Sequence, residues 1–220
     1  MPSSTVEDYL KQLYHEQQAA PERLVPMGRL AAAMGVVPGT ATAMVKALAD
    51  SGLVEYEPRT GARLTRGGEQ LALHVLRRHR LVELFLVKVL RLDWSEVHEE
   101  AEELEHAISQ KVLDRIDALL GHPSVDPHGD PIPTARGKVD ATVFLSLADS
   151  PLNTRLRITR ITDQDPPFLQ FLDRHGLTPG VTLTLTARDP LGDCITLRTE
   201  AGSVLTLGTG AAAKVLVEPL

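Results

Sequence analysis

A proline-rich stretch between residues 121 and 137 divides this chain into two parts that have different patterning. It reads GHPSVDPHGDPIPTARG and contains four prolines. Proline lacks a backbone N–H and fixes φ, so neither a long helix nor a central strand can cross the stretch. Before it, apolar residues recur at helical spacing; from about residue 151 onward, short segments alternate apolar and polar residues. We therefore expect a mainly α chain with a small all-β domain at its C-terminal end.

The alternating segments of the last seventy residues predict a small β-barrel. Gly, Pro and Asp turns separate five of them: LRITRIT, VTLTLTAR, ITLRTE, SVLTLG and KVLVEPL. Short strands at this regular spacing are typical of small barrels.

Composition and charge limit the class of protein. With 43% apolar and 24% charged residues, the chain fits a soluble globular protein. The longest apolar run, residues 81–90, is too short to span a bilayer, and no apolar leader follows a basic N-terminus. One cysteine, Cys194, allows no intrachain disulfide, so we expect a cytoplasmic protein with no membrane partner. A formal net charge of −6 argues against nonspecific coating of nucleic acid but allows a local basic face.

Residues 1–73 read as helices followed by a β-hairpin, the pattern of a winged helix-turn-helix domain. The second helix of the pair would enter the DNA major groove, and the hairpin would lie along the backbone. Near the start of that helix, small residues could meet base edges, and basic residues on the helix and hairpin could contact phosphates. The candidates are Gly39, Thr40 and Thr42 for bases, and Lys46, Arg59 and Arg63 for phosphates. The alternative is a small helical core whose threonines and arginines only face water.

Two long helices are expected in the following segment. The first covers about residues 71–90; the second begins near Ser95, a candidate N-cap, and ends at Gly121. Together they carry more apolar surface than two helices can bury against each other. We therefore expect a homodimer interface here.

The run HEEAEELEH, residues 98–106, concentrates carboxylates and imidazoles on one helix. At 100° per residue, four of its members fall within about 100° of arc. Upstream, His79 and Glu83 are spaced i, i+4 and point the same way. Imidazole nitrogen and carboxylate oxygen are ligands for Mn²⁺, Fe²⁺, Co²⁺, Ni²⁺ and Zn²⁺. The alternative is a solvated acidic face. The four residues on the shared face are His98, Glu102, Glu105 and His106.

The order of these motifs resembles the diphtheria-toxin-repressor family of metal-dependent transcription regulators, and its manganese branch more than its iron branch. The resemblance covers the whole chain and is most specific in RHRLVE, EELEH and PHGDPIP. It implies three domains: a winged helix-turn-helix domain over residues 1–73, a helical metal-binding and dimerisation domain with a Pro-rich linker over 74–150, and an SH3-like (FeoA-type) β domain over 151–220.

The resemblance also implies a primary metal site made of Asp8, Glu102, Glu105 and His106. Asp8 enters only through the resemblance, because it lies roughly opposite the apolar stripe of its own helix. Iron-type members place Met and Cys where this chain has Asp8 and Glu102. Carboxylates favour a harder ion than sulfur does, so we expect Mn²⁺, with Fe²⁺ as the alternative.

An ancillary metal site is implied as His79, Glu83 and His98, completed by a group from the β domain. The segment TDQDPP offers that group, and Asp163 is the residue we choose. Some manganese-responsive relatives instead use a pair within the linker, which here would be Asp126 and His128.

The predicted function is a manganese-dependent regulator that binds double-stranded operator DNA as a homodimer and represses metal-uptake genes. An iron-responsive regulator of the same family is one alternative. From another class, a helical di-metal carboxylate enzyme is a second. No Ser-His-Asp order, P-loop or HExxH element is visible, so we expect no enzyme.

Overall fold

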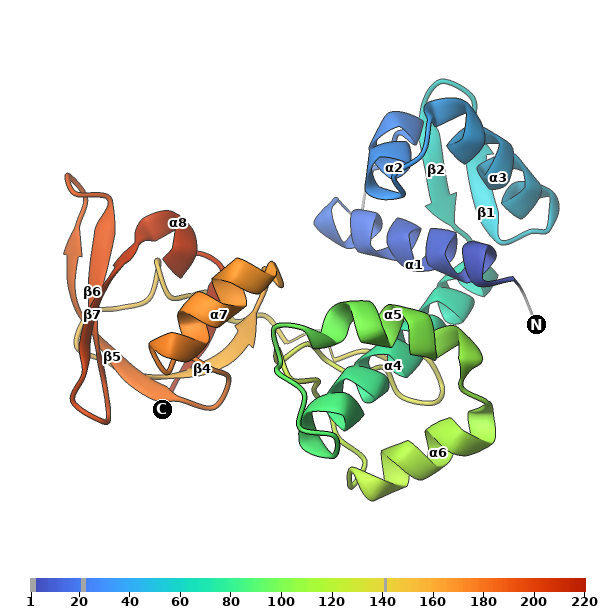
Figure 1. Cartoon of the computed structure of the whole chain (residues 1–220). Coiled ribbons are helices and arrows are strands. Elements are labelled where there is room, and N and C mark those ends of the chain that lie inside the picture. The colour runs from blue at the N-terminus through green and yellow to red at the C-terminus, as the bar shows by residue number, and fades with distance from the viewer. Residues whose placement is uncertain (1–2, 21–22, 141) are drawn as a thin grey trace. The chain divides into compact units, whose positions relative to one another are not determined.

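The computed structural model describes residues 3–20, 23–140 and 142–220. The chain separates into two compact units, and the boundary between them falls within one helix, α4 (Figure 1). Unit 1 comprises residues 1–79 and 133–139, and unit 2 comprises residues 80–132 and 140–220. The helices and hairpin expected for DNA binding therefore belong to unit 1, and the expected β domain belongs to unit 2.

Unit 1 contains the predicted helix-turn-helix followed by a two-stranded hairpin. Its apolar core is formed by residues from all of these elements, including the fully buried Leu10, Leu30 and Val45. The elements are α1 (Ser4–Ala19), α2 (Met27–Ala33), α3 (Pro38–Asp50), β1 (Val54–Glu57), β2 (Gly61–Leu64) and the first part of α4 (Arg66–Lys88).

The glycines and the proline at the helix ends of unit 1 have the backbone conformations that these positions favour. Gly35 follows α2 with φ +64° and Gly52 follows α3 with φ +72°, the left-handed conformation that ends helices. Pro38 occupies the first turn of α3, where its missing N–H has no helical partner to lose. Among the described residues no single helix has the length and apolar character needed to cross a membrane, although α2 and α3, which meet at 105°, satisfy both measures when taken together.

Helix α4 begins at Arg66, earlier than the residue 71 that we expected. The Oγ1 of Thr65 accepts the backbone N–H of Gly68 at 3.2 Å, which caps the first turn. Gly68 also lies against the carbonyl of Leu53, where an added Cβ would be 2.0 Å from the oxygen. Gly67 and Gly68 thus lie inside the helix, and Gly68 allows the helix to pack closely on the segment that leads into β1.

Unit 2 continues α4 and adds α5 (Val97–Ala107) and α6 (Gln110–Leu119). The expectation of one helix from Ser95 to Gly121 is wrong in two respects. The helix is interrupted at Ile108, and the Oγ of Ser109 caps α6 by accepting the N–H of Val112 at 3.4 Å. Ser95 is not a cap: it is buried, and its N–H and Oγ both donate to Oδ1 of Asp93.

The C-terminal part of unit 2 is an SH3-like antiparallel sheet with strand order β3-β8-β4-β5-β6-β7. The five predicted strands are confirmed as β4 to β8. The short strand β3 and two helices were not predicted; one of these helices, α7, lies against the sheet in Figure 1. The elements are β3 (Leu145–Ser146), β4 (Arg155–Ile161), α7 (Pro166–Arg174), β5 (Thr182–Asp189), β6 (Cys194–Thr199), β7 (Val204–Gly208), α8 (Thr209–Ala212) and β8 (Val215–Pro219).

The apolar core of the β domain extends into the helical part of unit 2. Trp94, from the segment between α4 and α5, is buried in the same cluster as Leu156, Ile158 and Leu177. Val87 of α4 packs against this cluster as well. Shared apolar burial therefore joins the two parts of unit 2.

We predict that Gly68→Ala destabilises unit 1. The new Cβ would meet the Leu53 carbonyl at 2.0 Å, and overpacking of this kind costs about 1–3 kcal/mol. Hydrogen exchange of the β1 and β2 amides should accelerate by about tenfold for each 1.4 kcal/mol lost. Gly67→Ala is the matched control, because its Cβ would lie 3.7 Å from the nearest atom, the Thr65 Oγ1. Equal exchange in both variants would contradict the packing argument.

Candidate metal centre

Three buried groups of unit 2 form a compact cluster of metal-ligand type. Glu83 lies on α4, whereas Asp126 and His128 lie in the proline-rich stretch after α6. Their side chains are about 1% exposed. Each offers one ligand atom, and these atoms lie within 4.8 Å of one another. We call residues 124–132, which carry two of the three groups, the ligand loop.

His128 presents one ring nitrogen to this cluster. Its Nε2 lies 2.8 Å from the carbonyl oxygen of Trp94, and because a carbonyl can only accept, Nε2 must carry the hydrogen. In the neutral tautomer that has its hydrogen on Nε2, the lone pair of Nδ1 is available to a metal ion. Nδ1 is buried, has no hydrogen-bond partner among the described residues, and lies 3.9 Å from Oε2 of Glu83. Fixing one ring nitrogen by a backbone carbonyl is the usual way to orient a metal-binding histidine.

The two carboxylate oxygens of Asp126 have different surroundings. Oδ1 accepts the backbone N–H groups of His128 at 2.8 Å and Asp130 at 2.9 Å. Oδ2 is buried without a hydrogen-bond partner in the described part of the chain, although it lies 3.6 Å from Nε of Arg80. Burial raises the pKa of the Asp126 carboxyl well above its ordinary value, and the carboxylates of Asp130 and Glu83 raise it further, against the opposing charge of Arg80.

These residues fit a divalent cation. Two of the three donors have a buried polar atom without a hydrogen bond, which is costly unless another partner satisfies it. The donors are carboxylate oxygens and one imidazole nitrogen, with no sulfur, a set that suits hard and borderline ions. A cation would also offset the repulsion between the carboxylates that raises the pKa of Asp126.

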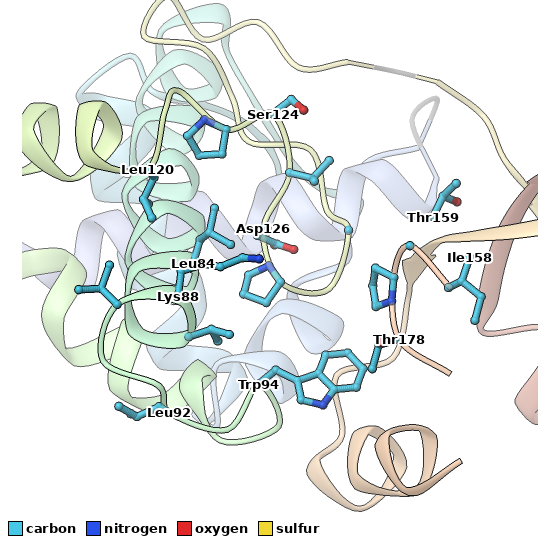
Figure 2. A pocket seen from close by; sticks show the side chains of 18 of the residues that line it. Leu84, Lys88, Leu92, Trp94, Leu120, Ser124, Asp126, Ile158, Thr159 and Thr178 are labelled. Carbon is cyan, nitrogen blue, oxygen red and sulfur yellow. The ribbon is translucent and has the colours of Figure 1, made fainter. Parts of the chain in front are cut away.

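An open pocket of about 1450 Å³ reaches the ligand loop from solvent. Figure 2 shows Asp126 on its wall between Leu84 and Trp94, with Thr159 of the β domain on the opposite side. The lining is largely apolar, with charged side chains such as Lys88 at intervals. Of the three cluster residues, Asp126 is among those that line this pocket.

Of the predicted ancillary residues, Glu83 belongs to this cluster and His98 lies beside Glu83. His79 and Glu83 are both buried and lie one turn apart on α4. The Nδ1 of His98 is 3.4 Å from Oε1 of Glu83, and its Nε2 is 3.7 Å from Oε1 of Glu102. Glu83 therefore directs one oxygen toward His98 and the other toward His128.

The structure places Asp163, the predicted β-domain ligand, elsewhere. Its carboxylate accepts a hydrogen bond from Nζ of Lys214, which lowers the pKa of Asp163. Asp163 does not occur in any of the His, Asp and Glu groups of the described residues that are close enough to hold an ion. The linker pair Asp126 and His128, the alternative from the sequence, lies against Glu83 instead.

The residues expected at the primary site are divided between the two units. Glu102, Glu105 and His106 lie on α5 of unit 2, and Asp8 lies on α1 of unit 1. Glu105 is fully buried, and its Oε1 is 3.4 Å from Nε2 of His106. The acidic run is thus not uniformly solvated: Glu105 faces inward, whereas the exposed glutamates of the run are Glu99, Glu100 and Glu103.

Sequence reasoning missed an ion pair beside Asp8. Glu7 is 4% exposed, and its Oε2 lies 2.6 Å from the guanidinium of Arg78 on α4. Lys11, one turn later on α1, is also buried. The buried charges lie outside the apolar stripe of α1, so periodicity gave no signal for them.

The predicted DNA-contact residues lie on α3 and the hairpin of unit 1. Gly39, Thr40 and Lys46 are exposed, and Arg59 is exposed at the hairpin turn with φ +68°. Two candidates already have partners within unit 1. The hydroxyl of Thr42 donates to the carbonyl of Pro38 at 2.7 Å, and Arg63 forms an ion pair of 2.6 Å with Glu55.

Comparisons with known families cover almost the whole chain. Residues 1–62 match the N-terminal DNA-binding domain of the iron-dependent repressors, residues 65–134 their metal-binding and dimerisation domain, and residues 145–219 the FeoA domain. These matches follow the same order as the elements described above.

Individual proteins resemble the chain at moderate identity. A solved manganese-dependent transcriptional repressor in complex with manganese is 37% identical, with a TM-score of 0.87 over 98% of this chain and 100% of that chain. MntR of Lysinibacillus sphaericus is 32% identical over 54% of this chain and 84% of that protein. IdeR of Mycobacterium tuberculosis is 35% identical over 59% of this chain, and the match spans only 55% of IdeR.

We predict that metal binding at the ligand loop changes the fluorescence of Trp94, the only tryptophan of the chain. Its ring is stacked on His128 with centroids 5.5 Å apart. Mn²⁺ or Co²⁺ at Nδ1 should quench its emission. His128→Ala removes a proposed ligand, so it should weaken the metal affinity by more than the about 10-fold that the loss of a supporting group costs. His122→Ala is the control, since His122 is exposed and paired with Asp117. An unchanged titration in His128→Ala would remove the ligand loop from the metal site.

Proposed function

Because the chain belongs to the diphtheria-toxin-repressor family of metal-dependent transcription regulators, we propose that it binds operator DNA in response to Mn²⁺ and acts as a repressor. The observation that carries this proposal is the Glu83–Asp126–His128 cluster, a buried cation-binding set in a chain that also has a winged helix-turn-helix. We expect the protein to act in the cytoplasm on double-stranded DNA.

The donor chemistry supports manganese over the alternatives. Both proposed ligand groups use carboxylate and imidazole, and the single cysteine, Cys194, lies in β6. Hard oxygen donors favour Mn²⁺ relative to ions that prefer sulfur. Several relatives are named as manganese-dependent and others as iron-dependent, so Fe²⁺ is the alternative ion.

The proposed primary ligands can join the two units of the chain. A bound divalent ion supplies positive charge that removes repulsion among carboxylates. Asp8 belongs to unit 1, whereas Glu105 and His106 belong to unit 2. When these residues share one ion, they restrict the positions that unit 1 can adopt. Without it, like charges keep the carboxylates apart, and unit 1 samples a wider range.

In a homodimer, restricting the position of unit 1 would affect how the two copies of α3 meet DNA. Several apolar side chains on the helices of unit 2, or directly after α4, are exposed, as a protein–protein interface requires. In a two-fold dimer, the two copies of α3 must be about 34–36 Å apart, or a multiple, to meet successive major grooves. For a near-complete shift from the mobile to the restricted state, the ion must bind the restricted state about 5 kcal/mol more favourably. The exposed apolar residues are Val89, Leu90, Leu104, Val112 and Leu119.

The enzyme considered from the sequence has less support. Family membership points to a regulator, and the winged domain has no role in a helical di-metal oxidase. Metal-dependent DNA binding without turnover of oxygen would distinguish the two.

We predict that His106→Ala abolishes metal-stimulated DNA binding while leaving the fold intact. His106 contributes a proposed ligand on α5, and its side chain is 19% exposed to solvent. Fluorescence anisotropy with promoter DNA should show Mn²⁺ raising the affinity of the parent protein at least tenfold and that of the variant little, an energy difference of about 1.4 kcal/mol or more.

Glu103→Ala provides the matched control for this experiment. It removes a charged side chain from the same helix, but from its exposed face. Its metal response should equal that of the parent protein. If His106→Ala responds to Mn²⁺ as strongly as this control does, the primary ligand assignment is wrong.

We further predict that Lys46→Ala and Arg59→Ala reduce the salt dependence of DNA binding. The slope of log K against log salt is negative, and each lost phosphate contact should reduce its magnitude by about 0.9. Arg174→Ala removes the same charge from the end of α7 and should leave the slope unchanged. A slope that is the same in all three variants would exclude Lys46 and Arg59 from the DNA interface.

A further inference from the structure

The backbone of the ligand loop is in direct contact with the β domain. The N–H of Ile161, at the end of β4, donates to the carbonyl oxygen of His128 at 2.8 Å. Gly129 passes so close to β4 that an added Cβ would lie 2.0 Å from the carbonyl oxygen of Thr159. The metal-ligand residue His128 and its neighbour therefore lie against the β domain with no space between them.

A buried carboxylate, Asp130, makes the side-chain contacts between the loop and the β domain. Its Oδ2 accepts a hydrogen bond of 2.8 Å from Nε2 of Gln164, and its Oδ1 pairs with the guanidinium of Arg160. Arg80 of α4 lies further away, with 3.8 Å between its Nη2 and the same Oδ1. The shorter contacts of Asp130 are thus to β4 and to the segment that follows it.

Asp130 is coupled in turn to the ligand Asp126. The N–H of Asp130 donates to Oδ1 of Asp126 at 2.9 Å, and the N–H of Asp126 donates to the carbonyl oxygen of Asp130 at 3.0 Å. These reciprocal bonds close a tight turn in which Gly129 has φ +87°. A displacement of Asp130 therefore displaces the carboxylate of Asp126.

We propose that Arg160 and Gln164 are positioning residues for the Glu83–Asp126–His128 centre. They contribute no ligand; they hold Asp130, and through it the turn that aims Asp126 and His128 at Glu83. The inference rests on the proposed metal binding at this centre. Because coupling between two equilibria is reciprocal, an ion bound at the centre also strengthens the docking of the ligand loop on β4 by the same factor.

Simple electrostatics predicts the opposite effect for one of these residues. Arg160 is a cation near a cation site, so removing its charge should strengthen metal binding if charge alone matters. If Arg160 acts by positioning the loop, its removal weakens metal binding. The sign of the change separates the two explanations.

The test measures Mn²⁺ affinity through the fluorescence of Trp94 in the full-length parent protein, Arg160→Gln and Gln164→Ala. Supporting groups around metal ligands contribute about 10–100-fold to affinity, and we expect a loss of about tenfold in each variant. Arg157→Gln is the matched control: it makes the same change on the same strand, where Arg157 pairs with Glu218 and not with the loop. Its affinity should equal that of the parent protein or exceed it slightly.

Hydrogen exchange provides a second measurement that a general loss of stability would not reproduce. In the parent protein, Mn²⁺ should slow exchange of the Ile161 amide, which donates to His128. In Gln164→Ala this protection should fall, while amides paired between β5 and β6 exchange as in the parent protein. If Arg160→Gln does not fold, Gln164→Ala carries the test, because it removes only one hydrogen bond.

The outcomes are distinct. Parent-like or tighter Mn²⁺ binding in both variants would overturn the positioning role and leave the metal centre in place. Absence of any Mn²⁺ response at Trp94 in the parent protein would overturn both the centre and this inference. DNA binding measured on the same samples decides the regulatory function separately, because the proposed primary site can act without the ligand loop.

Discussion

The carboxylate of Asp126 joins the parts on which the proposed metal chemistry depends. One of its oxygens accepts two backbone N–H groups and so closes the turn of the ligand loop, and the other lies in the interior facing the cluster. Placing carboxylates this close in a buried site costs free energy because they lose water and repel each other. The same arrangement would favour a divalent cation, so the repulsion that costs free energy without metal is the repulsion that an ion bound at the proposed centre would remove.

Glu83 extends this arrangement to the acidic helix. One of its oxygens faces His128 of the ligand loop and the other faces His98, whose second nitrogen is near Glu102. A continuous series of polar groups thus runs from the loop through α4 to α5, all within unit 2. Glu83 contacts both His128 and His98, so a rotation of its carboxylate toward one histidine also changes its distance to the other.

Local pattern predicted much of the fold but not the geometry of the centre. The helix-turn-helix, the hairpin and five strands follow from periodicity and from glycines such as Gly35 and Gly52, which act on their immediate neighbours. The break at Ser109 was missed because apolar spacing is similar on both sides of it. Asp163 was chosen wrongly as a ligand because the sequence does not show that Lys214, 51 residues later, lies beside it and pairs with its carboxylate. Likewise, the prolines indicated an irregular segment, whereas the burial of His128 depends on Trp94 and Ile161, which are distant in sequence.

The interruption at Ile108 separates two tasks that a single helix would have linked. α5 carries Glu105 and His106, and α6 carries the exposed Val112 and Leu119. On one continuous helix, the angle between the acidic face and the apolar face would follow rigidly from the number of intervening residues. With a cap at Ser109, each face can be oriented independently, and a residue gained or lost at the joint need not rotate one surface relative to the other.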